Sequence, residues 1–220
     1  MQKYAVVIDF DGTITCDDMG LAVITEFGAP GWEEGIEKYR SGEFNSMELH
    51  RWEVGFLPAA RAKEMRERAA DEAEIRPGLR ELVEYAAANE IPVEIASSGW
   101  SFYIRAILKR QGFGEIPFTS ASANFDGGEF ATYGLSPGAT RCEINGICKC
   151  DRVRPRQEAG TTVIYVGDGL SDFCVAAQSD VVFARRSLAQ HCRRAGIAFT
   201  PFEDFFDVLD GIRRLVEAEG

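Results

Sequence analysis

Apolar and polar positions alternate in blocks along this chain, and the blocks predict strands separated by helices. Short apolar runs lie at residues 4–8 (YAVVI), 92–96 (PVEIA), 162–166 (TVIYV) and 181–183 (VVF). Apolar runs of this kind are typical of parallel strands that are buried on both faces. Helical spacing lies between them, as in Leu79, Leu82 and Ala86 ahead of the second run. We therefore expect an α/β fold with a doubly wound parallel sheet.

The segment from residue 16 to residue 76 has a different pattern, with helical spacing and no convincing strand. Trp32, Ile36 and Tyr39 would share one helix face, and Ser46 is a plausible N-cap for a following helix. Pro77 and Gly78 are expected to form the hinge by which the chain returns to the sheet. We therefore predict a core domain made of residues 1–15 and 77–220, with a small helical domain of residues 16–76 inserted after the first strand.

Composition and charge narrow the classes of partner. The 220 residues carry a formal net charge of -11, so the chain has no basic field that would attract nucleic acid or an anionic membrane surface. The first apolar run is too short for a signal-peptide core, and no stretch approaches the length of a membrane helix. We expect a cytoplasmic protein in which the six cysteines stay reduced.

Acidic motifs follow two of the predicted strands. Asp9 and Asp11 lie in DFDGT, directly after the first run, and Asp168 and Asp172 lie in GDGLSD, after the third. Ligands of open α/β sheets bind outside the carboxyl ends of the strands, so these motifs should converge. Carboxylates that are close together repel one another unless a cation neutralises them, and hard oxygen ligands suit Mg²⁺. The sequence therefore predicts a magnesium site.

A second set of residues has the chemistry of a phosphate site. Ser97 and Ser98 follow the second predicted strand and offer hydroxyl groups, while Gly99 allows a backbone N–H to approach closely. Lys149 offers an ammonium group for phosphate oxygens. Arg152 and Arg154 are alternatives to Lys149, although a guanidinium does not readily replace a compact point charge.

These motifs identify the chain as a member of the haloacid dehalogenase superfamily of phosphohydrolases, which it resembles over nearly its whole length. The resemblance implies a Rossmann-like core in which Asp9 attacks phosphorus while Asp11 acts as general acid and then as general base. It also implies that Ser97 and Lys149 hold the phosphoryl group. Asp168, with Asp172, would complete the Mg²⁺ site beside Asp9 and the backbone carbonyl of Asp11.

The inserted helical segment resembles the cap of the phosphoserine-phosphatase-like branch, which implies a small phosphorylated metabolite as substrate. DFDGTIT, the CKC loop around Lys149 and VVFARRSLAQHC resemble the methionine-salvage phosphatases that act on hydroxy-keto-methylthiopentenyl phosphate. Phosphocholine and phosphoethanolamine phosphatases share the cysteine near the lysine. Phosphoserine phosphatases fit less well, because they usually carry serine at the position of Gly12 and glutamate at that of Asp18. Arg51 is either a substrate contact or an exposed helix residue.

Other interpretations remain open. A phosphomutase would use the same covalent chemistry with another acceptor, and a phosphate-sensing module would need only the binding groups. Cys142, Cys148 and Cys150 lie close to Lys149 in the sequence, and packing of buried thiols is favoured over a zinc site because a fourth ligand is missing. His50 and His191 are expected on a surface or a helix face. The oligomeric state is open, with a homodimer among the alternatives.

Overall fold

The computed structural model describes residues 3–218, which divide by their mutual contacts into two compact units. The first unit combines the chain up to Cys16 with Glu74–Ala96 and the segment from Lys149 onward. The second unit combines Asp17–Ala73 with Ser97–Cys148. The division of the chain into a core domain and a cap over residues 16–76 stays a prediction.

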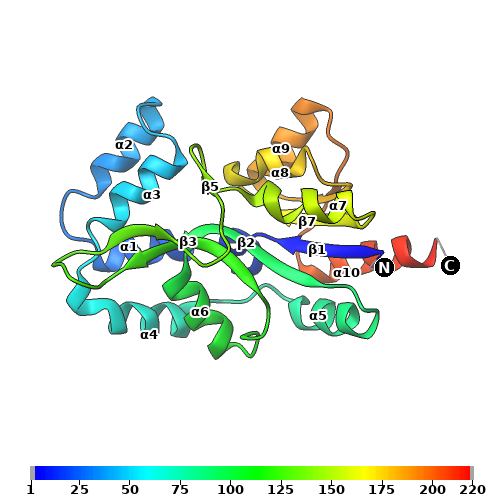
Figure 1. The fold of residues 1–220 in the computed structure, drawn as a ribbon, viewed down its shortest axis with the longest axis horizontal. Helices are drawn as coiled ribbons and strands as arrows, with labels where there is room; N and C mark the ends of the chain where they lie inside the picture. The colour runs from blue at the N-terminus through cyan, green and yellow to red at the C-terminus, as the bar shows by residue number, and fades with distance from the viewer. Residues whose placement is uncertain (1–2, 219–220) are drawn as a thin grey trace. The chain divides into compact units, whose positions relative to one another are not determined.

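The first unit is a parallel sheet with helices on both faces. Its strands are β1 (Tyr4–Ile8), the first part of β2 (Val93–Trp100), β7 (Thr162–Gly167), β8 (Val181–Ala184) and β9 (Thr200–Pro201). Its helices are α5 (Leu79–Ala88), α7 (Arg154–Glu158), α8 (Phe173–Ala176), α9 (Arg186–Ala195) and α10 (Phe205–Glu217). Helices α7, α8 and α9 cover one face, and α5 and α10 cover the other (Figure 1). This arrangement confirms the predicted doubly wound sheet.

The apolar runs become the central strands because they can be buried on both faces. All five residues of β1 are buried, and β1 pairs in parallel with β2 on one side and with β7 on the other. The register sets Val6 opposite Val93 and Ile164, while Ile8 lies opposite Val166. The carboxyl ends of β1 and β7 therefore lie side by side, and the acidic motifs begin there.

The second unit contains most of the remaining helices and two antiparallel pairs of strands. Its helices are α1 (Met19–Phe27), α2 (Glu33–Ser41), α3 (Ser46–Val54), α4 (Ala62–Glu72) and α6 (Ser101–Arg110). Its strands are β3 (Phe118–Asn124), β4 (Thr132–Leu135), β5 (Arg141–Cys142) and β6 (Gly146–Ile147), and β3 pairs with β4 and β5 with β6. The main sheet has the strand order β4-β3-β2-β1-β7-β8-β9. The residues between 17 and 73 are thus mainly helical, as predicted.

Two local predictions were wrong. The second strand was expected to end at Ala96, but β2 continues to Trp100, because the small residues of the Ser97-Ser98-Gly99 segment fit a buried strand. Ser46 was expected to cap a helix, but the N-cap of α3 is Asn45. The Asn45 side chain accepts a hydrogen bond from the Glu48 N–H at 3.0 Å, and the Glu48 carboxylate accepts one from the Asn45 N–H at 2.8 Å. This reciprocal pair satisfies two N–H groups that a helix start leaves free.

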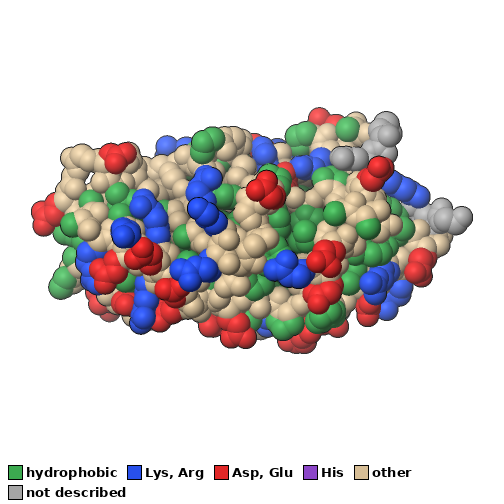
Figure 2. Space-filling model, turned by 90° about the horizontal axis from the view of Figure 1, so that it is seen from below, with side chains coloured by type: hydrophobic (Ala, Val, Ile, Leu, Met, Phe, Trp, Pro, Cys, Tyr) green, Lys and Arg blue, Asp and Glu red, His purple; other side chains and the backbone are tan. Residues whose placement is uncertain are grey.

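The charged surface is mixed in sign. Figure 2 shows acidic and basic side chains interspersed on the face that it presents. Exposed side chains of opposite charge also form ion pairs, as between Arg68 and Glu26 at 3.1 Å and between Arg110 and Asp71 at 2.7 Å. Among residues 3–218, no helix is both long enough and apolar enough to cross a membrane.

The capping geometry leads to a test of stability. Asn45→Ala removes the side-chain oxygen that accepts the Glu48 N–H and is expected to lower the free energy of unfolding by about 1 kcal/mol. Ser46→Ala, which replaces the first helical residue, should change it by less than about 0.5 kcal/mol. Urea denaturation of both variants measures the difference. Equal losses in the two variants would contradict the assignment of Asn45 as the cap.

Candidate active site

The ends of two adjacent strands bring the first acidic groups together. The backbone N–H of Asp9 donates to the Val166 carbonyl at 2.9 Å, so Asp9 continues the pairing of β1 with β7. Asp168 follows directly after β7. Both side chains are buried. Two carboxylates that lie more than 150 residues apart in the sequence thus meet at one edge of the sheet.

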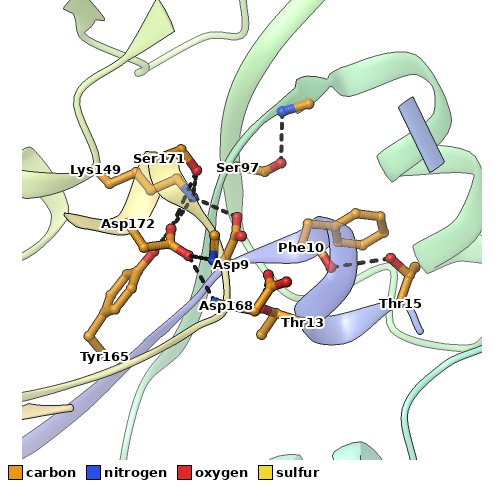
Figure 3. A network of polar contacts seen from close by, with 12 residues as sticks. Asp9, Phe10, Thr13, Thr15, Ser97, Lys149, Tyr165, Asp168, Ser171 and Asp172 are labelled. Carbon is orange, nitrogen blue, oxygen red and sulfur yellow. Dashed lines mark hydrogen bonds and ion pairs between the residues drawn. The ribbon is translucent and has the colours of Figure 1, made fainter. Parts of the chain in front are cut away.

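Lys149 links Asp9 to the second acidic motif (Figure 3). Its ammonium nitrogen lies 2.6 Å from Asp9 Oδ1, 2.6 Å from Asp172 Oδ1 and 3.1 Å from the Ser171 hydroxyl. Lys149 opens a single helical turn, Lys149–Arg152, and is only 2% exposed. The ammonium group is therefore fixed between two carboxylates. Lys149 is therefore not a solvated surface residue.

Asp172 is held on all sides. Its Oδ1 also accepts the Tyr165 hydroxyl at 2.6 Å, and its Oδ2 accepts the backbone N–H groups of Asp168 at 3.0 Å and Gly169 at 2.9 Å. The residue is fully buried. Because both of its oxygens are engaged, Asp172 anchors Lys149 and the turn after β7.

Asp168 packs against the turn that follows Asp9. The Thr13 hydroxyl donates to Asp168 Oδ1 at 2.9 Å, and the Arg186 guanidinium lies 3.6 Å from Oδ2. Gly12 has a φ of +75°, and a Cβ atom there would lie 2.6 Å from Asp168 Oδ2. The glycine of DFDGT is therefore required both by the backbone conformation and by the close approach of this carboxylate.

The site carries more negative than positive charge. Burial raises the pKa of Asp9 well above its usual range, the charge of Asp172 adds to this, and Lys149 acts in the opposite direction. Burial and then Asp172 also raise the pKa of Asp168. Burial would lower the pKa of Lys149, but Asp172 and Asp9 outweigh it and raise the value. The Lys149 ammonium group thus stays charged, while burial and the charge of Asp172 favour the protonated forms of Asp9 and Asp168.

Three of these carboxylates could hold a cation. Oxygen atoms of Asp9, Asp168 and Asp172 all lie within 4.8 Å of one another. The excess of negative charge and the hard oxygen donors fit a divalent ion. Asp11 lies in the same turn as Gly12, in an extended conformation. Its carboxylate is not among the three.

The predicted phosphate-binding serines belong to the second unit. Ser97 is buried, and its hydroxyl oxygen accepts the Gly99 N–H at 2.9 Å (Figure 3). Ser98 is also buried, and within the described part of the chain its hydroxyl has no hydrogen-bond partner. A buried hydroxyl without a partner is costly in a folded protein, so it is a reasonable contact for a ligand. Arg51 is exposed on α3, and its role stays a prediction.

Several residues of the site were not predicted from the sequence. Tyr165 appeared only as part of an apolar strand, although its hydroxyl binds Asp172. Thr13 and Ser171 lie inside the two acidic motifs, and a hydroxyl group so close to the acidic residues is the sequence signal for a polar contact there. Arg186 lies in the ARRS segment, where its proximity to β8 was the available clue.

The remaining polar side chains singled out from the sequence have ordinary surroundings. All six cysteines are free thiols, and the Sγ of Cys142 accepts the Asn145 N–H at 3.4 Å. Cys150, next to Lys149, is buried. The rings of His191 and Phe173 are stacked, with centroids 3.7 Å apart. The rings of His50 and Trp100 have an edge-on arrangement, with centroids 6.3 Å apart.

Comparison with known proteins agrees with this geometry. The family model described as haloacid dehalogenase-like hydrolase matches residues 6–177. The chain belongs to this family. The match includes both acidic motifs and Lys149, so the clustered side chains lie in the region by which the family is defined.

Individual relatives are similar over their full length. A 2-hydroxy-3-keto-5-methylthiopentenyl-1-phosphate phosphatase of Exiguobacterium sibiricum is 32% identical, with 94% of this chain and 95% of the relative covered. A protein of the same name from Bacillus cereus is 29% identical, with 97% and 98% covered.

Solved structures show the same fold. A phosphoserine phosphatase described as a phospho-aspartyl intermediate analogue has a TM-score of 0.70 at 15% identity, with 96% of this chain and 99% of that chain covered. Another phosphoserine phosphatase, from T. onnurineus, has a TM-score of 0.66 at 21% identity, with 96% and 94% covered. At 15% and 21% sequence identity, these similarities show the fold alone.

A buried acid of the second unit was missed as well. Glu53, on α3, is 6% exposed, and burial raises its pKa to about 8, with a smaller contribution from the charge of Asp18. No lysine or arginine forms an ion pair with it among the described residues. Glu53 is therefore largely protonated near neutral pH.

Glu53 generates a prediction on pH and stability. Because the folded state holds this proton up to about pH 8 while the unfolded chain releases it near 4.5, the free energy of unfolding should fall as the pH rises between these values. In Glu53→Gln this fall should be smaller by an amount on the order of a few kcal/mol. Urea denaturation at several pH values measures it. Glu67→Gln, at an exposed position of α4, should leave the slope unchanged, and an unchanged slope in both variants would contradict the assignment.

Proposed function

We propose that this protein is a Mg²⁺-dependent phosphomonoester hydrolase that acts on a small soluble metabolite through an aspartyl-phosphate intermediate. The observation that carries the proposal is the ion pair between Lys149 and Asp9 beside Asp168. This arrangement combines a carboxylate nucleophile, a fixed cation for phosphate oxygens and an acidic group for a metal ion.

The proposed roles divide two chemical steps among few residues. Asp9 would attack phosphorus, and Asp11 would donate a proton to the leaving oxygen. In the second step Asp11 would accept a proton from the water that attacks the aspartyl-phosphate, which releases inorganic phosphate and restores Asp9. Lys149, with Ser97, Ser98 and the N–H of Gly99, would hold the phosphoryl oxygens.

Mg²⁺ is the proposed cofactor. Asp9, Asp168 and the backbone carbonyl of Asp11 would hold it, with Asp172 close by. Bound there, the ion would neutralise charge on the phosphoryl oxygens. The close spacing of three buried carboxylates supports the proposal, because a cation among them would offset their repulsion and keep Asp9 deprotonated, as a nucleophile must be.

For the substrate we propose 2-hydroxy-3-keto-5-methylthiopentenyl-1-phosphate, the phosphate ester that appears in the names of the relatives. The full-length similarity at about 30% identity supports this choice. Phosphoserine is the weaker candidate, because the Asp18 carboxylate accepts the Leu21 N–H at 2.9 Å as the N-cap of α1 and is therefore engaged. Phosphocholine and phosphoethanolamine are further candidates, and Arg51 is a proposed substrate contact. We further propose that the enzyme acts in the cytoplasm, with residues 16–76 as its cap.

The nucleophile can be tested directly. Asp9→Asn should lower Mg²⁺-dependent hydrolysis of an aryl phosphate by at least about 10³-fold, because an amide cannot form the covalent intermediate. Asp210→Asn, at an exposed position of α10, is the matched control and should retain full activity. Undiminished turnover by Asp9→Asn would exclude the mechanism.

Release of phosphate from a panel of the candidate metabolites, compared by kcat/KM, then ranks the substrates.

The metal site can be tested without activity. An ion that binds only the folded state stabilises it by about 2.7 kcal/mol at a hundredfold excess over its Kd, so Mg²⁺ should raise the melting temperature by several degrees. Asp168→Asn should remove most of this rise. KCl at equal ionic strength controls for screening of the acidic cluster. An equal rise in wild type and variant would place the ion elsewhere.

A further inference from the structure

A buried arginine that the proposed chemistry does not use lies under the turn that carries Asp9 and Asp11. Arg76 is 7% exposed, and its guanidinium donates to three carbonyl oxygens of that turn. The bonds are Nε to Thr13 O at 2.8 Å, Nη2 to Gly12 O at 2.9 Å and Nη2 to Thr15 O at 3.3 Å. Among residues 3–218, no carboxylate lies within ion-pair distance of it. Its partners are therefore backbone oxygens.

The turn needs these donors because it is irregular. Asp11 and Gly12 have non-helical backbone angles inside the segment Phe10–Ile14. A regular helix would satisfy its carbonyl groups internally, but here the N–H and hydroxyl of Thr15 both bind the Phe10 carbonyl. Buried carbonyl groups that lack a partner are costly, and Arg76 satisfies those of the next residues.

Arg76 also ties the turn to two other segments. Its backbone N–H donates to Ile14 O at 2.8 Å, and the Cys16 N–H donates to Glu74 O at 2.9 Å. Its Nη1 donates to Glu203 O at 3.3 Å, just before α10. The positions where the chain leaves the first unit after Cys16 and re-enters it at Glu74 are thus joined beside the guanidinium.

Only a planar fork of donors fits these acceptors. Four carbonyl oxygens in several directions match the five N–H groups of a guanidinium, whereas an ammonium offers three donors from a single point. The neighbouring Arg185 and Arg186 make this an unfavourable place for a further cation. An arginine at this position therefore serves the geometry of the turn, through its four carbonyl partners, rather than an ion pair.

We propose that Arg76 is a positioning residue that holds the backbone of the Asp9–Thr15 turn in the conformation required for phosphoryl transfer. The inference rests on the proposed function, since it concerns the same site. Arg76 does not touch the reacting atoms. Its loss should therefore displace Asp9 and Asp11 without removing any group that binds phosphate.

Chemical rescue tests this role. Arg76→Ala should lower kcat for an aryl phosphate by about 100-fold with KM nearly unchanged, as expected for a small displacement of a catalytic group. Guanidinium chloride at concentrations that do not denature the variant should restore a large part of kcat, because the ion can occupy the space lined by the four carbonyl groups. Sodium chloride at equal ionic strength should not. A kcat equal to that of wild type, or a reduced kcat that guanidinium does not raise, would overturn the proposal.

A matched variant separates this effect from a general loss of stability. Arg156 is a partly buried arginine of the same unit, and its guanidinium binds the Glu94 carboxylate at 2.7 and 3.0 Å. Arg156→Ala should show no guanidinium-dependent gain in kcat. If Arg76→Ala does not fold, Arg76→Lys decides: a reduced kcat in a folded protein supports the proposal, and a wild-type kcat overturns it. Asp9→Asn reports separately on the proposed function, since full activity of that variant would refute the mechanism whatever Arg76 does.

Discussion

The candidate site depends on one buried ion pair network, in which the Lys149 ammonium lies between Asp9 and Asp172. Buried charges are costly unless they are paired and hydrogen-bonded, and here each charge has such partners. The Tyr165 hydroxyl and two backbone N–H groups hold Asp172, so the ammonium is fixed relative to β7 as well as to β1. Loss of either carboxylate would leave the lysine less well placed.

The network leaves a surplus of negative charge, and that surplus explains the chemistry of the site. Three carboxylates face the Lys149 ammonium and, at Asp168, the guanidinium of Arg186. Burial and then the charge of Asp172 raise the pKa values of Asp9 and Asp168. A divalent cation removes this repulsion. The geometry of the site therefore favours a metal-dependent hydrolase, in agreement with the family to which the chain belongs.

Much of this arrangement could be predicted from the sequence because its signals are local. Apolar runs such as YAVVI, rich in β-branched residues, are typical of buried strands, and a motif that follows directly after such a strand lies at the carboxyl end of the sheet. The end of β2 could not be predicted in this way, because Ser97 and Ser98 are polar residues that are typical of loops. Tyr165 and Arg76 were missed for a different reason. The Tyr165 hydroxyl belongs to an apolar run, which does not indicate its bond to Asp172 seven residues later, and the partners of the Arg76 guanidinium lie more than 60 residues away in the sequence.

The hydrogen bond between Cys16 and Glu74 has a consequence beyond catalysis. The long helical excursion between these residues starts and finishes at a single point, so its length does not affect the register of the strands. Such a segment can lengthen, shrink or be exchanged in evolution while the sheet keeps its structure. Changes within this segment can therefore accumulate independently of the strands that carry Asp9 and Asp168.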